Sequence, residues 1–257
     1  MGECESFSAS SSEGAHGMAM YVELFGRDRY YGGMLRESRE DEFVSNVFGP
    51  LRNFETITWL VELLEIAFRG HGYESEIESG YTLDFWRRFP PPPARTVPEN
   101  DTEVSCVLET ENFTFLVIAR YWHELSRQTA HDVQRDQVVR TLDAGITALG
   151  DRCRLLVLTT DAEAPDIVQK YWDDPALLQS KMTEPSSAAA SEDLAQRIGW
   201  TNWGALREAL ASRIGETPIN LTQWNFAKDL VAYLDLVSTR GRGLIVRAAH
   251  RPDETDS

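Results

Sequence analysis

Residues 154–159 constrain the fold most, because they form a short and continuous apolar run. Such a run is typical of a β-strand that is buried on both faces. Two more strands are predicted at residues 104–109 and 113–120, and the three residues between them suit a tight hairpin. A long helix is predicted over residues 131–149, between the hairpin and the buried run. This order of elements predicts an α/β core with a mixed central sheet.

Helical patterns flank this core on both sides. The predicted helices begin near residue 38 and cover residues 56–68, 188–197, 202–214 and 221–237, and residues 241–247 suit an edge strand. Within the 202–214 helix, Thr201 or Asn202 is expected to be the N-cap. The fold class is therefore α/β, with N-terminal helices and a helical C-terminal subdomain.

Composition sets the expected domain boundaries. Residues 1–17 are rich in Ser, Gly and Glu, so we expect a disordered N-terminal tail. The α/β core is expected over residues 18–180 and the helical subdomain over residues 181–250. The last residues, 251–257, are expected to be a disordered tail.

The net charge limits the partners of the chain. The chain has 41 acidic and 25 basic residues, a formal net charge of −16. Indiscriminate binding to nucleic acid or to an anionic membrane is therefore disfavoured, because both would be repelled. A local basic groove is still compatible with this charge.

Cysteine usage and hydropathy indicate a cytoplasmic protein. Cys4, Cys106 and Cys153 are odd in number and far apart, which argues against a disulfide framework and fits a reducing compartment. The N-terminus lacks the basic region and apolar stretch of a signal peptide. No apolar run approaches the roughly 20 residues of a membrane span. We therefore expect no membrane association.

Common catalytic motifs are absent from the sequence. It contains no Walker-type phosphate loop, no dinucleotide fingerprint and no Gly-x-Ser-x-Gly nucleophile elbow. The five histidines lack metal-ligand spacing, and no Cys-x-x-Cys pair occurs, so a zinc site is not expected.

The order of hairpin, long helix and buried strand resembles the core of the PD-(D/E)XK, or restriction-endonuclease-like, nucleases. The chain is similar to a subset of small bacterial proteins of that superfamily. The segments that carry the resemblance are 40–48, 104–120, 135–145, 198–203 and 229–234. The resemblance implies a mixed sheet of restriction-endonuclease-like type and a nuclease-like core over residues 18–180.

The resemblance also implies where a catalytic site would lie. In such nucleases an Asp and a Glu on the two hairpin strands hold Mg²⁺, and a Lys two residues after the Glu acts on the attacking water. These positions correspond to Ser105, Ile118 and Arg120, and a supporting Gln of the next helix corresponds to Gln137. Ile cannot bind a metal, and Arg stays protonated. The motif is therefore degenerate.

Relocated acids are an alternative to a degenerate site. Glu109 lies four residues after Ser105 and Glu103 lies two residues before it, so all three share one strand face. Glu103, Glu109 and Glu42 of the first helix are candidate ligands of one Mg²⁺ ion, with Glu109, Arg120 and Gln137 as candidate catalytic residues. The simpler interpretation is that the acids are ordinary strand-end residues and that Arg120 forms a salt bridge.

Two other pairs of charged residues have several interpretations. Arg87 and Arg88, beside aromatic residues, form the best candidate patch for a phosphate backbone, although an interface with protein is equally compatible. Asp136 and Arg140 are four residues apart on the long helix, and this spacing predicts a surface ion pair.

These observations favour a nuclease-like protein with a degenerate site, which binds rather than cleaves. It is expected to be a component of a nucleic-acid-processing or genome-defence system, with a protein partner and with DNA or RNA as possible ligands. No cofactor is expected, or Mg²⁺ if the site is active. The alternatives are an active Mg²⁺-dependent nuclease, or a pure interaction module that uses Trp200, Trp203 and Trp224 at its helical end.

Overall fold

The computed structural model describes residues 38–49, 58–70, 72–73, 80–121, 124–126, 135–183, 191–216, 224–225 and 227–235. The chain divides into two units, residues 1–51 and 52–257. In the first unit, α2 (Ser38–Phe48) is an amphipathic helix in which Phe43, Val44, Val47 and Phe48 are buried. The expected tails and the expected strand over residues 241–247 lie outside the described residues.

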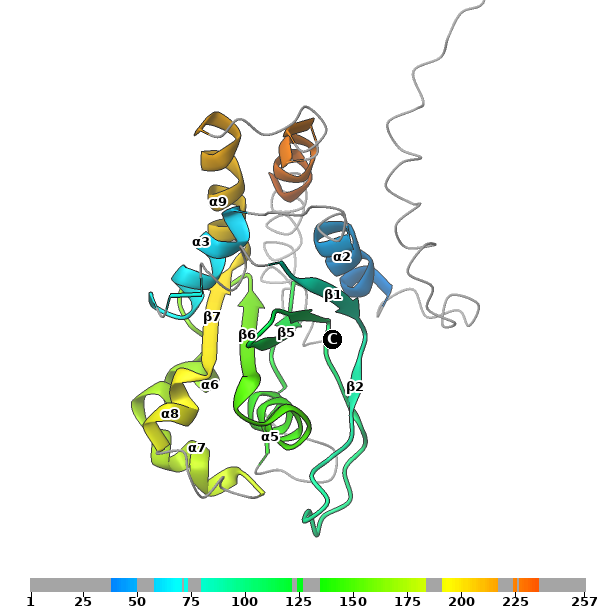
Figure 1. The fold of residues 1–257 in the computed structure, drawn as a ribbon, viewed down its shortest axis with the longest axis vertical. Coiled ribbons are helices and arrows are strands. Elements are labelled where there is room, and N and C mark those ends of the chain that lie inside the picture. The colour runs from blue at the N-terminus through cyan, green and yellow to red at the C-terminus, as the bar shows by residue number, and fades with distance from the viewer. Residues whose placement is uncertain are drawn as a thin grey trace, which may run out of the picture. The chain divides into compact units, whose positions relative to one another are not determined.

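A five-stranded mixed sheet forms the centre of the second unit (Figure 1). Its strands lie in the order β1 (Thr82–Phe85), β4 (Cys106–Glu109), β5 (Thr114–Ala119), β6 (Cys153–Thr159) and β7 (Ile198–Asn202). The pairs β1–β4 and β4–β5 are antiparallel, whereas β5–β6 and β6–β7 are parallel. The predicted α/β class with a mixed sheet is therefore confirmed.

The predicted hairpin is the pair β4–β5. Its register runs from Cys106 opposite Val117 to Glu109 opposite Thr114. A small second sheet, β2 (Arg88–Phe89) and β3 (Thr102–Glu103), lies next to it along the chain. Between β1 and β2 the backbone of Trp86 adopts a positive φ of 58°, where its N–H donates to the carbonyl of Ser105. The two sheets are thus separated by an irregular step at Trp86 and Ser105.

Helix α5 (Gln137–Leu149) covers one face of the sheet. Leu142 of this helix joins Leu116, Ile118 and Leu155 of the strands in the main hydrophobic core. Its approach is close at Gly145, where an added Cβ would lie 2.5 Å from Leu116 Cδ1. The described helix begins six residues after the predicted start, because Asp136 is its N-cap and residues 135 and 136 are not helical, while residues 131–134 lie outside the described part.

Three short helices connect β6 to β7 on the same side as α5. They are α6 (Asp166–Asp173), α7 (Pro175–Lys181) and α8 (Ser191–Gln196). Each contributes one or more apolar residues to the core under α5, including Val168, Leu178 and Leu194. A single 3₁₀ turn, Gly150–Arg152, joins α5 to β6.

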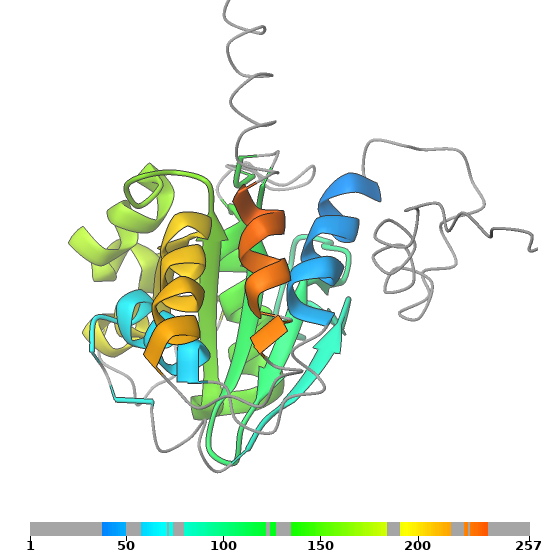
Figure 2. The same ribbon diagram turned by 90° about the horizontal axis from the view of Figure 1, so that it is seen from above.

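Helices α3 (Thr58–Ala67) and α9 (Trp203–Glu216) lie side by side and both contact β7 (Figure 2). The ring of Phe68, just after α3, lies where a Cβ on Gly199 would be, at 2.7 Å. It also meets the ring of Phe115 edge-on, with centroids 5.6 Å apart. Glycine at position 199 therefore allows α3 to pack directly on the last strand.

The region expected to be a helical subdomain, residues 181–250, also contributes to the sheet. Residues 198–202 form β7, which the sequence analysis did not predict. The helix predicted over residues 202–214 is α9, and Asn202 Oδ1 accepts a hydrogen bond from Ala205 N at 2.8 Å, as an N-cap does. In the described part of the chain, no helix is both long enough and apolar enough to cross a membrane.

Candidate functional site

Ser105 and Ile118, the two positions that correspond to the metal-binding acids, are neighbours across the β4–β5 hairpin. Ser105 N donates to Val117 O at 2.9 Å, and Ser105 Oγ accepts from Ala119 N at 3.1 Å. The ladder ends at the pair Cys106–Val117, and Ser105 and Ile118 are the residues just beyond this pair on the two sides of the hairpin. The structure thus brings these two positions together at one end of the hairpin.

Neither side chain of this pair is available to a ligand. Ile118 is 1% exposed and belongs to the core under α5. The hydroxyl of Ser105 is used by the backbone of β5, because it also donates to Ala119 O at 3.5 Å. An apolar side chain and an engaged hydroxyl supply none of the carboxylate oxygens that Mg²⁺ prefers. The residues at this position therefore do not fit the metal that the resemblance implies.

Arg120 is fixed where the parallel strands β5 and β6 end. Its backbone N donates to Leu158 O at 2.8 Å, and its carbonyl accepts from Trp203 Nε1 at 2.8 Å. Trp203 is 5% exposed, so its side chain is packed within the protein at this end of the sheet. Arg120 thus lies two residues after Ile118, at the same end of the hairpin, with a half-buried side chain.

Gln137 is the first residue of α5 and bonds the preceding loop. Its backbone N donates to Ser126 O at 3.0 Å, and its Oε1 accepts from Ser126 N at 3.4 Å. These two bonds join the start of the helix to residues 124–126. The hydrogen bonds described for Gln137 therefore hold a loop, and its role at a nuclease-like site stays a prediction.

Glu109 lies at the other end of β4, roughly 13 Å from Ser105 at about 3.3 Å per residue. Its Oε1 accepts a hydrogen bond from Arg87 Nη1 at 2.7 Å. Glu103 lies on β3 in the second sheet, where its Oε2 accepts from Arg88 Nε at 2.9 Å. The two candidate metal ligands are therefore each paired with one of the two candidate phosphate-binding arginines.

The structure does not assemble the predicted metal site from these acids. Glu42 is in the first unit, and its side chain lies outside the described part. Among the residues that are described, no three His, Cys, Asp or Glu side chains are grouped so that they could hold a metal ion. Glu42, Glu103 and Glu109 as ligands of one ion thus stay a prediction that the described geometry does not support.

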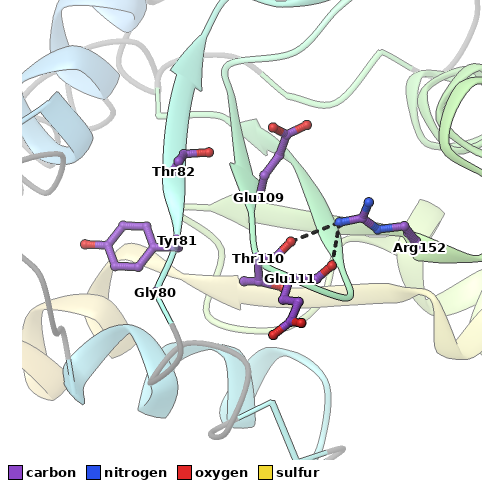
Figure 3. A pocket seen from close by; sticks show the side chains of 7 residues that line it. All are labelled: Gly80, Tyr81, Thr82, Glu109, Thr110, Glu111 and Arg152. Atoms are coloured by element: carbon purple, nitrogen blue, oxygen red, sulfur yellow. Dashed lines mark hydrogen bonds between the residues drawn. The ribbon is translucent and has the colours of Figure 1, made fainter.

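An open cavity of about 380 Å³ lies beside Glu109 (Figure 3). Its lining residues are Gly80, Tyr81, Thr82, Glu109, Thr110, Glu111 and Arg152. Arg152 Nη2 donates to Thr110 O at 3.0 Å and to Glu111 O at 2.8 Å, so this cation is bound to the hairpin turn. Burial raises the pKa of the Tyr81 phenol, so this group is neutral at pH 7. The wall of the cavity thus carries the carboxylates of Glu109 and Glu111, of which Glu109 is already paired with Arg87, and the guanidinium of Arg152.

A buried polar network at the start of α5 was not anticipated from the sequence. Arg135 is 1% exposed, and its Nη2 donates to Asp143 Oδ2 at 2.8 Å while its Nη1 donates to Thr183 Oγ1 at 2.9 Å. Glu99 Oε1 lies 3.4 Å from Arg135 Nε, with its side chain 2% exposed. The network joins three segments that are distant in sequence. A signal was present in Asp143, a charged residue on the apolar face of α5.

The predicted surface pair of Asp136 and Arg140 is wrong. Asp136 is the buried N-cap of α5, where its Oδ1 accepts from Val139 N at 3.0 Å and its Oδ2 accepts from the Tyr171 hydroxyl. Burial and this carboxylate both raise the pKa of Tyr171. Arg140 instead donates to Thr102 Oγ1 at 3.0 Å and to backbone carbonyls beside it. A capping residue points back at the helix end, so it cannot pair along the helix.

Comparisons with known proteins add no assignment. No family model matches the chain, and neither the curated proteins nor the solved structures give a significant match.

Proposed function

We propose that the chain is a PD-(D/E)XK nuclease-like protein with a degenerate catalytic site, which acts by binding. It would work in the cytoplasm as a component of a nucleic-acid-processing or genome-defence system, together with a protein partner. The order of the β4–β5 hairpin, α5 and the parallel strand β6 supports this proposal, because the resemblance implies the same order. Fold alone does not specify function, so the proposal depends on the site.

The observation that carries the proposal is the proximity of Ser105 to Ile118. The resemblance implies that these are the positions of the metal-binding acids, and Ser105 bonds the backbone of Val117 and Ala119, the residues on either side of Ile118. A glutamate in place of Ile118 would lie in the core under α5, where a charge is strongly disfavoured. Arg120 adds a permanent cation that does not deprotonate water. The hairpin thus lacks the acids that the resemblance implies for a nuclease site.

A combined binding and cleavage assay tests this proposal. The purified protein would be incubated with labelled single- and double-stranded DNA and RNA in the presence of millimolar Mg²⁺ or Mn²⁺. Each incubation would be carried out at a low and at a raised salt concentration, on the order of 50 and 200 mM. We expect binding that weakens with salt and no cleavage of any substrate. Cleavage that Glu109→Gln abolishes would instead establish an active nuclease with relocated acids.

A pure protein-interaction module is the second candidate, and one observation favours it. Arg87 and Arg88 are paired with glutamates, and Arg135, Arg197 and Arg207 are paired with aspartates. Cations that are already paired offer less attraction to a phosphate backbone. In the same assay, this function predicts no nucleic-acid affinity even at low salt. Co-expression with products of neighbouring genes would then identify a stable protein complex.

A further inference from the structure

Helix α3 ends in a backbone conformation that favours glycine but is occupied by arginine. Gly70 N donates to Glu65 O at 2.8 Å and Arg69 N approaches Ile66 O at 3.4 Å, which is the Schellman pattern. Arg69 occupies the left-handed position of this motif, with φ of 55°. An L side chain is disfavoured there. The arginine side chain must therefore have a compensating interaction.

That interaction is a stack on Trp172 of α6. Arg69 Cζ lies 3.9 Å from the centroid of the indole ring. The indole is itself fixed, because Trp172 Nε1 donates to Ile198 O at 2.9 Å. Stacking of a guanidinium on an aromatic face leaves its N–H groups, which lie in its plane, free to bind an acceptor. Arg69 is thus held in one orientation without the use of its donors.

Arg69 differs in this respect from the other arginines. A carboxylate, a hydroxyl or a backbone carbonyl accepts a hydrogen bond from Arg87, Arg88, Arg135, Arg140, Arg152, Arg154, Arg197 and Arg207. For Arg69, the described part of the chain provides the indole stack and no acceptor. The protein carries a net charge of −16, so acids are plentiful, yet none of the described carboxylates pairs with the exposed Arg69.

A cavity of about 310 Å³ lies beside this guanidinium, between the end of α3, the helices α6 and α8, and the start of β7. Arg69 is the one charged residue in its described lining, and Gln196 is the one residue with an amide. Phe68, Ile198 and Ala195 supply apolar surface. The cavity therefore combines an oriented cation, a second polar group and an apolar wall.

We propose that this cavity binds a small organic anion, whose carboxylate or phosphate is recognised by Arg69. The guanidinium fork matches both of these groups. The apolar wall fits a compact ring or aliphatic body, and about 310 Å³ lies near the lower end of the usual range for small-molecule sites, roughly 300 to 1,000 Å³. The site is far from the hairpin positions Ser105 and Ile118 in the sequence and is independent of the proposed function.

Titrations with three probes test the site. Benzoate, phenyl phosphate and inorganic phosphate would each be added to the full chain, with binding followed by ¹H–¹⁵N NMR of the tryptophan indole groups. We expect saturable binding of benzoate or phenyl phosphate that shifts the Trp172 signal, assigned with Trp172→Phe. Inorganic phosphate should bind about tenfold more weakly than phenyl phosphate, because it cannot use the apolar wall.

Arg69→Gly is the decisive variant, because glycine suits the left-handed position and leaves the fold intact. It should weaken binding of the organic anions by about tenfold or more. Lys170→Ala is the matched control, because it removes an exposed positive charge from the same helix as Trp172 and should leave binding unchanged.

Three outcomes would overturn the proposal. The first is no saturable binding of any probe to the wild-type protein. The second is an equal loss of affinity in Arg69→Gly and Lys170→Ala, which would indicate attraction by charge alone. The third is at least about tenfold tighter binding of a short peptide with a free terminal carboxylate than of benzoate, which would make the occupant a protein segment.

Discussion

The two ends of the β4–β5 hairpin use their polar groups in opposite ways. At one end, Ser105 gives its hydroxyl to the backbone of β5 and lies opposite Ile118, which is buried under α5. At the other end, Glu109 lies at the rim of an open cavity, where it binds Arg87. One end thus combines a buried apolar side chain with an engaged hydroxyl, and the other end carries a carboxylate beside an open cavity.

This difference shows that the position of a residue in a strand does not determine its chemistry. Both ends belong to the same hairpin, because Glu109 is the last residue of β4 and Ser105 directly precedes its first residue, Cys106. The two ends differ in what lies over them. Helix α5 packs on Ile118, whereas the Glu109 end borders the cavity. A buried hairpin end cannot present a carboxylate to a metal without a large desolvation cost.

The largest effect is expected from a charge at the buried end. Ile118→Glu should lower the free energy of unfolding by about 4 kcal/mol or more, because it places a carboxylate in the core. Ile118→Val, which removes one methylene, should cost only about 1 kcal/mol. Urea denaturation followed by circular dichroism measures both. A mild effect of the glutamate would mean that this end is open to water after all.

A smaller effect is expected from the hydroxyl at the same end. Ser105→Ala should cost about 1 kcal/mol, because Ala119 N loses its acceptor in a partly buried place. Ser105→Thr keeps the hydroxyl and serves as the control in the same denaturation experiment. If alanine proved neutral, the hydroxyl would not be holding the strands together, and it would be free for another role.

The open end should tolerate substitution well. Arg87→Ala and Glu109→Gln should each cost less than about 1 kcal/mol, because the side chains of the pair are 39% and 36% exposed. The double variant should reveal a coupling of roughly 0.5 kcal/mol, reduced by added salt. A coupling several times larger would show that Glu109 is part of a desolvated site.

The smallest effect of all is expected when a thiol reagent is added to the folded protein, because Cys106 and Cys153 are both buried. Burial raises the pKa of Cys153 to about 12 and also raises the pKa of Cys106. In a Cys4→Ser background, neither thiol should react with a thiol reagent between pH 7 and 9 until the protein unfolds. The pKa values are raised in the folded state, so stability is full below the unfolded pKa and falls as pH rises above it. Labelling of the folded protein at pH 8 would contradict this packing.

The sequence was a good guide to the central strands, because their apolar runs are local signals. The strands β4, β5 and β6 all fall within or next to the predicted segments. The last strand, β7, was missed. Its sequence includes Gly199 and Asn202, which are poor strand residues, and both serve tertiary needs. Gly199 makes room for Phe68, and Asn202 caps α9.

The site was harder to predict, because its determinants are contacts between distant residues. A two-residue period predicts a shared strand face for Ser105 and Glu109, but Ser105 lies just outside β4 and Glu109 lies at the opposite end of the strand. The partner of Glu109 is Arg87, 22 residues earlier, and no local pattern indicates that pair. The same holds for the stack of Arg69 on Trp172.

Calorimetric titration with Mn²⁺, on the wild-type protein and on Glu109→Gln, would decide whether the hairpin holds a metal ion. We expect no saturable binding to either protein, because Ser105, Ile118 and Arg120 offer no carboxylate and Glu109 is paired with Arg87. Saturable binding to the wild-type protein that Glu109→Gln abolishes would contradict it. The open end of the hairpin would then be a metal centre, and the chain would be an active nuclease with relocated acids.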